Sequence, residues 1–212
     1  MSDELLKIFN HHQGKLADKW QAYLSEWEHL FAPFRNEKIN LFEIGVHNGG
    51  SLEIWAKYFV RAQKIIGCDN NPDCRGLTFS DPRISIILGD VNSDAVESKL
   101  RGVSPELKII IDDGSHQSGD IIQSFARYFK FVQPGGYYLI EDLHTSYWDA
   151  QNGGLNNPYS ALSFLKGLAD MVNLEHWETK HAKANFLSPY ETHYGCHFGG
   201  TDLFSVRSVK FL

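Results

Sequence analysis

The sequence predicts an α/β fold around a mostly parallel β-sheet, and three observations carry this prediction. Short apolar runs alternate with helical segments between residues 40 and 142. Two of these runs end in adjacent acids, Asp112-Asp113 and Glu141-Asp142, and a glycine-rich turn follows the first run. Alternating strands and helices form parallel βαβ units with right-handed crossovers, and such sheets bind ligands at the carboxyl ends of their strands.

Length and composition bound the class of protein. The chain has 212 residues, of which 42% are hydrophobic, and a formal net charge of −6, which suits one domain with a sizeable core. Acids and bases are interspersed, so no nucleic-acid partner is expected. The three cysteines make no disulfide framework and fit a reducing compartment. Because there is no apolar leader and no run of ~20 apolar residues, we expect a cytoplasmic protein without a transmembrane segment.

Residues 1–37 predict a helical cap on the sheet. Their apolar residues recur at helical spacing, Gly14 interrupts the pattern, and Pro33 ends it. The aromatic residues of the second helical stretch are expected to pack in the core; they are Trp20, Tyr23 and Trp27.

Residues 38–212 predict the sheet-forming core, which makes a single domain, 1–212, with the cap. The expected strands are 40–46, 64–69, 84–89, 107–113 and 137–142, the last after a Pro-Gly-Gly turn at 134–136. The expected helices are 51–59, 94–100, 119–131 and 160–173. Asn, Gly and aromatic residues in 145–158 indicate a mobile loop over the strand ends. Residues 190–212, with a glycine turn near 199–201, indicate an antiparallel hairpin that completes a seven-stranded sheet.

The two acidic pairs predict a cation site if their strands are neighbours. Two carboxylates ~4 Å apart repel by roughly 4 kcal/mol at an effective dielectric of about 20, so the cluster needs protons or a cation. All-oxygen ligands favour a hard divalent ion such as Mg²⁺. Successive strand residues face opposite sides, so one of Asp112 and Asp113 is expected to reach the metal. We favour Asp113, with Asp112 facing a cofactor or the backbone; the plainer alternative is that these acids only cap helices.

The glycine turn predicts a small adenosyl ligand. Its middle position is His47, which fits a G-x-G-x-x-G dinucleotide fingerprint badly. Asp69 ends the second strand, where a carboxylate can bind ribose hydroxyls, and Asp90 ends the third, on the expected adenine side. A plain structural turn remains the alternative for each feature alone. The cofactor-binding candidates are Glu43, Gly45, His47, Gly49, Ser51, Asp69, Asp90 and Asp112.

The order of these motifs resembles that of class I S-adenosylmethionine-dependent methyltransferases, over roughly residues 38–212. The segments Ile111–His116 and Glu141–Trp148 are similar to the metal-dependent sugar O-methyltransferases of the mycinamicin and macrocin type, and Asp18-Lys19-Trp20 resembles a stretch before their core. The resemblance implies a Rossmann-like methyltransferase fold, S-adenosylmethionine and Mg²⁺ as cofactors, and methylation of a sugar hydroxyl in a natural product or surface polysaccharide. It also implies the metal ligands Asp113, Glu141 and Asp142, with His116 as general base beside Asp113.

Three residues near the second acidic pair have two interpretations each. His144 could act as a second catalytic base or only support the acidic pair through a hydrogen bond. Tyr147 and Trp148 could stack on a sugar or could pin the loop. Two other functions stay open: methylation of a non-sugar vicinal diol such as a catechol, and cofactor binding without catalysis. The sequence also leaves a homo-oligomer open.

Overall fold

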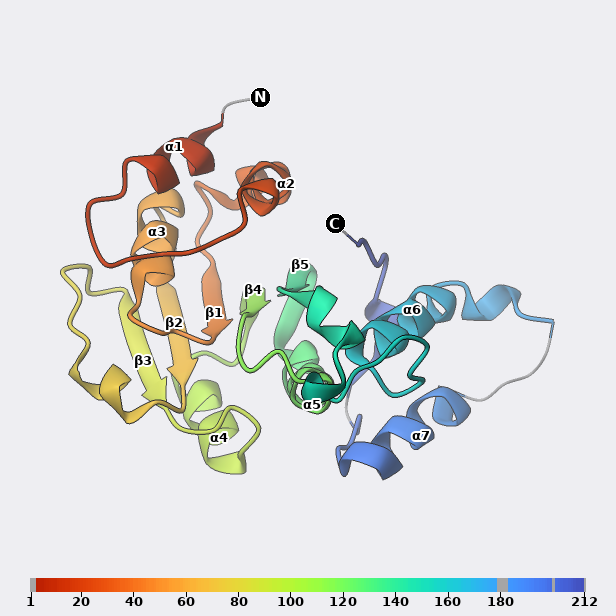
Figure 1. The fold of residues 1–212 in the computed structure, drawn as a ribbon. Coiled ribbons are helices and arrows are strands. Elements are labelled where there is room, and N and C mark those ends of the chain that lie inside the picture. The colour runs from red at the N-terminus through yellow and green to blue at the C-terminus, as the bar shows by residue number, and fades with distance from the viewer. Residues whose placement is uncertain (1–2, 179–182, 200, 212) are drawn as a thin grey trace.

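Five parallel strands form one sheet in the order β3-β2-β1-β4-β5. The computed structural model describes residues 3–178, 183–199 and 201–211. The strands are β1 (Asn40–Ile44), β2 (Lys64–Asp69), β3 (Ile84–Leu88), β4 (Leu107–Asp112) and β5 (Val132–Ile140). The parallel sheet and the crossover helices confirm the predicted α/β class, and Figure 1 shows the strands side by side.

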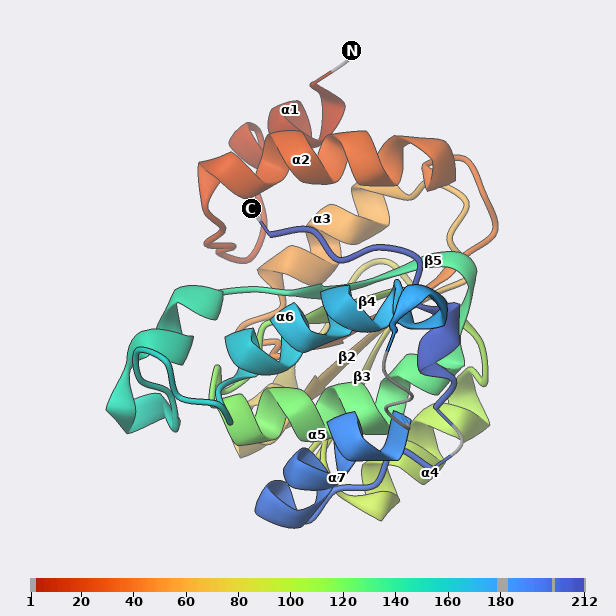
Figure 2. The ribbon, with the colours of Figure 1, turned by 90° about the vertical axis from the view of Figure 1, so that its right-hand side faces the viewer.

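Alternation along the strands divides the core between the two faces of the sheet. Leu41, Ile109 and Ile111 pack in one cluster with α1 (Glu4–Asn10), α2 (Gln21–Phe31) and α3 (Gly50–Tyr58). Phe42 and Ile110, one residue out of step, pack in another with α4 (Asp94–Val103) and α5 (Ser118–Tyr128). Because successive strand side chains point to opposite faces, both faces are apolar and both are covered. Figure 2 shows α1–α3 on one side of the sheet and α4 and α5 on the other.

The N-terminal cap forms as predicted, with one exception among its aromatic residues. Trp27 is buried against Trp55 of α3, with ring centroids 5.5 Å apart. Trp20 is 61% exposed, so its predicted place in the core is wrong: it lies just before α2 begins, outside the helical face that packs on α3. The stretch between α1 and α2 runs across the start of α3, where a side chain at Gly50 would overlap the backbone of Leu16.

The C-terminal part of the prediction is wrong. In the described residues of 190–212 there is no strand: α7 (Lys183–Tyr194) extends into this range, and a 3-10 turn follows at Leu203–Ser205. The expected turn at 199–201 includes residue 200, which lies outside the described residues. The apolar residues Phe198 and Leu203 pack with Phe164 of α6 (Ala161–Met171) instead of pairing as strands. The described sheet therefore has five strands rather than seven.

Two smaller expectations also differ from the structure. β5 begins at Val132, so the Pro-Gly-Gly segment lies inside the strand, where the pairing with β4 shifts register between Leu107 and Ile109. The segment expected to be a loop, 145–158, includes most of one 3-10 turn, Leu143–Tyr147, and all of another, Asp149–Gln151. Backbone hydrogen bonds such as Gly154 N–H to the Ser146 carbonyl close it. The mobility of this loop stays a prediction. No helix in the described residues has the length and apolar character to cross a membrane.

Candidate functional site

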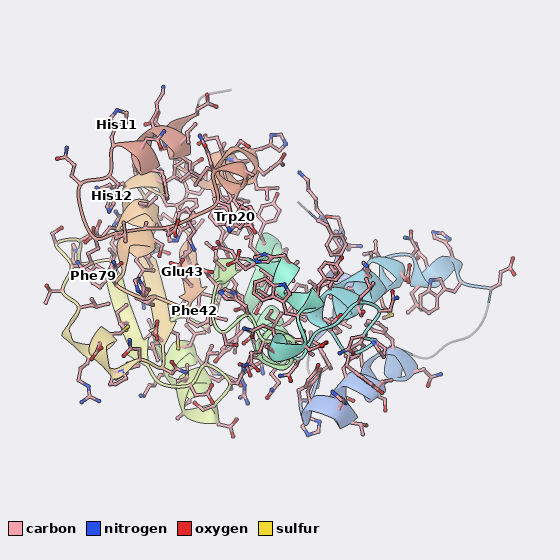
Figure 3. The ribbon with its side chains drawn as sticks, viewed as in Figure 1. His11, His12, Trp20, Phe42, Glu43 and Phe79 are labelled. Carbon is pink, nitrogen blue, oxygen red and sulfur yellow. The ribbon has the colours of Figure 1, made fainter. Side chains whose placement is uncertain are left out.

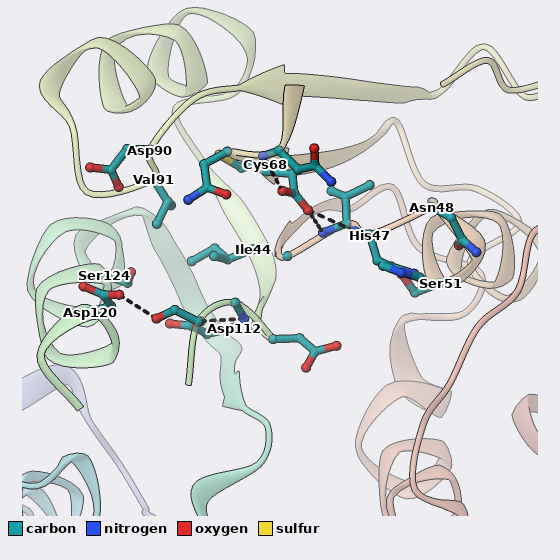
Figure 4. Close-up of a pocket in the computed structure, with 18 of the residues that line it drawn as sticks. Ile44, His47, Asn48, Ser51, Cys68, Asp90, Val91, Asp112, Asp120 and Ser124 are labelled. Atoms are coloured by element: carbon teal, nitrogen blue, oxygen red, sulfur yellow. Dashed lines mark hydrogen bonds between the residues drawn. The ribbon is translucent and has the colours of Figure 1, made fainter. Parts of the chain in front are cut away.

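A cavity of about 440 Å³ lies at the carboxyl ends of β1 to β4. β1 is flanked by β2 on one side and β4 on the other, so successive crossovers leave it in opposite directions and open a crevice there. Open α/β sheets bind ligands at this switch point, and the volume is in the range of small-molecule sites. Figure 4 shows Asp90 at one end of the cavity, His47 and Ser51 at the other, and Asp112 between them.

Gly45 brings the two central strand ends into contact. Its φ is +86°, and a Cβ built there would overlap the carbonyl group of Asp113, whose carbon lies 2.7 Å away. Asp113 N–H donates in turn to the Ile44 carbonyl at 2.9 Å, which extends the β1–β4 pairing past the strands. Glycine is the residue that allows this backbone conformation and this approach.

Six of the eight predicted cofactor residues line the cavity: Gly45, His47, Ser51, Asp69, Asp90 and Asp112. Asp69 uses one carboxylate oxygen to accept hydrogen bonds from the backbone N–H groups of Val46 (2.8 Å) and His47 (3.0 Å), so it holds the glycine turn in place. Burial raises the pKa of Asp112 to about 7.

The other two, Gly49 and Glu43, lie outside the cavity lining. Gly49 caps α3 with a φ of +85°. Glu43 is fully buried and accepts hydrogen bonds from Ser51 Oγ (2.9 Å) and Trp55 Nε1 (3.1 Å). Burial raises the pKa of Glu43, against the opposing effect of Lys19.

A second cluster, next to the cavity, joins the loop after β4 to the loop after β5. Nε2 of His116 lies 3.8 Å from Asp113 Oδ1 and 3.8 Å from Asp142 Oδ2. Asp142 Oδ1 is buried and accepts no hydrogen bond from any described residue. Asp113, His116 and Asp142 each offer a ligand atom within 4.8 Å of the others, as do Asp113, Glu141 and Glu43. The structure therefore brings Asp113, Asp142 and the predicted base His116 together, and Glu141 meets Asp113 in a separate group; among the described residues no such group holds all three predicted metal ligands.

Lys19 enters this cluster from the N-terminal segment, and sequence reasoning gave it no role. Its ammonium group donates hydrogen bonds to Asp113 Oδ2 and to Glu141 Oε1 (2.6 Å) and lies 3.4 Å from Glu43 Oε1. Burial alone would lower the pKa of Lys19, but the three carboxylates outweigh it and raise that pKa. Burial raises the pKa of Glu141 to about 8, although Lys19 opposes this shift.

Aromatic side chains form an exposed rim beside the cluster. The His144 ring lies 5.9 Å from that of Trp20 and 5.2 Å from that of Trp148. Trp148 and Tyr147 are about half exposed and do not line the cavity. Figure 3 marks Trp20, which precedes α2, and Glu43 on β1. Trp20 belongs to this rim. Its helical spacing in the sequence suggested a place in the core, and its place in the rim is visible only in the folded structure.

Proteins with similar sequences include sugar O-methyltransferases. An 8-demethyl-8-alpha-L-rhamnosyl tetracenomycin-C 2'-O-methyltransferase from Streptomyces olivaceus is 36% identical over 73% of this chain and 42% of its own length. The mycinamicin VI 2''-O-methyltransferase of Micromonospora griseorubida is 34% identical over 71% of this chain and 39% of its own. The chain thus spans about two fifths of these relatives' length. No family model matches.

A solved structure supports the same relation. The mycinamycin-pathway methyltransferase MycE, in complex with Mg, SAH and mycinamycin VI, aligns with a TM-score of 0.66 and 30% identity over 82% of this chain and 48% of that one. The chain is thus homologous to the sugar O-methyltransferases of the mycinamicin, macrocin and tetracenomycin type, and its fold is that of the class I S-adenosylmethionine-dependent methyltransferases, as the resemblance of its motifs predicted.

Proposed function

We propose that this protein transfers a methyl group from S-adenosylmethionine to a sugar hydroxyl in a Mg²⁺-dependent reaction. One observation carries the proposal: Asp113 belongs both to the lining of the 440 Å³ cavity and to the carboxylate–histidine cluster. A methyl donor in the cavity and a hydroxyl held at the cluster would therefore be adjacent, which is the arrangement that group transfer requires.

The cavity fits an adenosyl cofactor by its shape and its acids. Asp90 lies at one end and the glycine turn at the other, as Figure 4 shows. Gly45, which has no side chain, lines the cavity between these ends. S-adenosylmethionine, when bound, supplies an electrophilic methyl group on a cationic sulfonium, and the acids Asp112 and Asp113 beside the cavity suit a cation.

The cluster fits a divalent cation because a buried carboxylate oxygen has no hydrogen bond, although His144 Nδ1 lies 3.9 Å from it. Asp142 Oδ1 accepts no hydrogen bond from the described residues, and such an atom is costly unless a proton or cation satisfies it. Asp113, Glu141 and Asp142 would hold the ion. Bound Mg²⁺ would orient a vicinal diol and favour its alkoxide.

His116 is the proposed general base. Its Nε2 faces Asp113 and Asp142 at 3.8 Å, so it would take the hydroxyl proton at the point where the acceptor oxygen is held. The loop that carries it is fixed, because Thr145 Oγ1 donates to the His116 carbonyl at 3.0 Å. Tyr147 and Trp148, exposed beside the cluster, are the proposed sugar platform.

We also propose that residues 1–212 act as one unit in the cytoplasm, on a sugar acceptor rather than on nucleic acid. Three cysteines without disulfides support a reducing compartment. The net charge of −6 and the lack of a basic stripe argue against nucleic acid.

Calorimetric titration with S-adenosylhomocysteine and with Mg²⁺ tests the proposal. We expect saturable binding of both, loss of Mg²⁺ binding in Asp113→Asn, and no change in Asp94→Asn, a control on the exposed side of α4. With a methyl-accepting sugar in hand, His116→Ala should lower kcat by ~10²–10⁴-fold. Absence of nucleoside binding would rule out the methyltransferase, and wild-type turnover in His116→Ala would rule out the base.

A further inference from the structure

Lys19 is a buried cation built into the carboxylate cluster. Its side chain is only 4% exposed, although lysine is rarely buried unless it is paired. It comes from the segment before α2 and meets the ends of three strands, through Glu43 of β1, Asp113 after β4 and Glu141 after β5.

The carboxylate oxygens divide between two sides of the cluster. Lys19 donates hydrogen bonds to Asp113 Oδ2 and Glu141 Oε1, and its ammonium group lies 3.4 Å from Glu43 Oε1. We call Glu43, Asp113 and Glu141 the inner group. Asp113 Oδ1 faces the other way, toward His116 Nε2, as does Asp142 Oδ2. Asp113, His116 and Asp142 form the outer group, and Asp113 connects the two.

We propose that Lys19 is a positioning residue whose ammonium group serves as a permanent cation of the inner group, so that a single divalent ion binds, at the remaining oxygens of Asp113 and Glu141 together with Asp142. The inference rests on the proposed metal-dependent function and adds to it. By bonding one oxygen each of Asp113 and Glu141, Lys19 fixes these side chains and leaves their remaining oxygens free. Without it, three carboxylates would face one another, and a second divalent ion would satisfy them.

The segment around Lys19 is anchored in a way that suits this role. Lys15 donates to Glu53 from its backbone N–H (3.0 Å) and from its side chain (2.8 Å), which ties the segment to α3. Leu16, Ala17 and Asp18 line the cavity beside it. The position of the Lys19 ammonium group is therefore set by the fold and not by a flexible surface chain.

Counting bound Mn²⁺ in Lys19→Met tests the proposal. Methionine keeps the apolar stem and removes the charge, and Mn²⁺ serves as the probe because the free ion can be quantified by electron paramagnetic resonance. We expect a single Mn²⁺ on the wild type and a second on Lys19→Met. The variant's Tm in EDTA should fall by at least ~6 °C and recover with Mn²⁺. Lys7→Met, which removes a charge from the exposed side of α1 away from the cluster, should bind a single Mn²⁺.

A second variant covers the case in which Lys19→Met does not fold. Lys19→Met/Glu43→Gln removes one positive and one negative charge, so it should fold and bind a single Mn²⁺. Failure of this double variant to fold, or a single Mn²⁺ on Lys19→Met with wild-type affinity and Tm, would overturn the inference. A wild type that binds no Mn²⁺ would instead refute the metal-dependent function, so the two failures are distinguishable.

Discussion

Replacing Gly45 by alanine tests the contact between the two strand ends on which the site is built. The new Cβ would overlap the Asp113 carbonyl group, and the backbone φ of +86° is one that L side chains rarely adopt. Asp113 cannot easily move away, because its N–H is bonded to the Ile44 carbonyl at 2.9 Å. The substitution therefore strains both loops that line the cavity.

The expected loss of stability follows from these two contributions. A left-handed non-glycine residue costs about 1–2 kcal/mol, and an overpacked contact costs about 1–3 kcal/mol. Together these lower the free energy of unfolding of Gly45→Ala by roughly 2–5 kcal/mol, which corresponds to a Tm drop of about 4–20 °C. Thermal melts and S-adenosylhomocysteine titration would measure this, and we expect weaker nucleoside binding as well.

Gly102→Ala is the matched control. Gly102 lies in α4, and a Cβ there meets no atom within 4 Å, so alanine should raise stability by up to about 1 kcal/mol through helix propensity. A Gly45→Ala protein with the wild-type Tm and nucleoside affinity would refute the account of how the two loops meet.

Three further predictions concern the acids and the aromatic rim. Burial raises the pKa of Asp112 to about 7, above the ~3.9 of an unfolded aspartate. The folded state thus holds this proton more tightly, and Asp112 should contribute a fall in stability of roughly 4 kcal/mol in EDTA as pH rises from about 4 to 7. Burial also raises the pKa values of Glu43 and Glu141, so melts of Asp112→Asn should show a shallower slope that keeps their contribution, and an unchanged slope would exclude Asp112. Asp142→Asn should weaken Mn²⁺ binding at least ~10-fold but leave S-adenosylhomocysteine affinity unaltered, since Asp142 does not line the cavity; calorimetry that shows both losses together would contradict separate sites. Trp148→Ala should raise the sugar KM about 10-fold, the value of one aromatic stacking contact, and steady-state kinetics that show a fall in kcat alone would argue against stacking.

The strand ends of the site could be predicted from local sequence. Apolar runs that end in acids predict β4 and β5, and parallel pairing places their ends at one edge. The structure confirms that Glu141 N–H bonds to the Asp112 carbonyl at 2.9 Å, so the two acidic segments are direct neighbours. Secondary structure thus sufficed to bring Asp113 and Asp142 together.

The contributions from the two ends of the chain could not be predicted this way. Lys19 contacts carboxylates 94 and 122 residues away along the chain, and no local pattern encodes these contacts. The signals in the sequence were the resemblance of Asp18-Lys19-Trp20 to a stretch before the core of related enzymes, and Glu43, an acid within an apolar run. The C-terminal glycine turn suggested a hairpin, yet Thr201 Oγ1 donates to the Ala126 carbonyl at 3.0 Å. In this region the described residues pack against α5 and do not form the strands of a hairpin.

Backbone strain gives an independent reason to place function at this edge. Among the described residues, the non-glycine positions with positive φ are His47, His116, Asp142, Asn152 and Asn156. His47, His116 and Asp142 lie in the loops that follow β1, β4 and β5, at the edge of the sheet that carries the site. Each such residue costs on the order of 1–3 kcal/mol and persists only where its surroundings enforce it. The surroundings enforce it here: Asp69 accepts a hydrogen bond from the His47 N–H, and Thr145 Oγ1 donates to the carbonyls of both His116 and Asp142.

The left-handed backbone at His116 and Asp142 directs the loops after β4 and β5 toward each other at the cluster. There, His116 Nε2 lies 3.8 Å from the Asp142 carboxylate. Glycine would relieve this strain, but it would remove the imidazole and the carboxylate that the proposed base and metal site require.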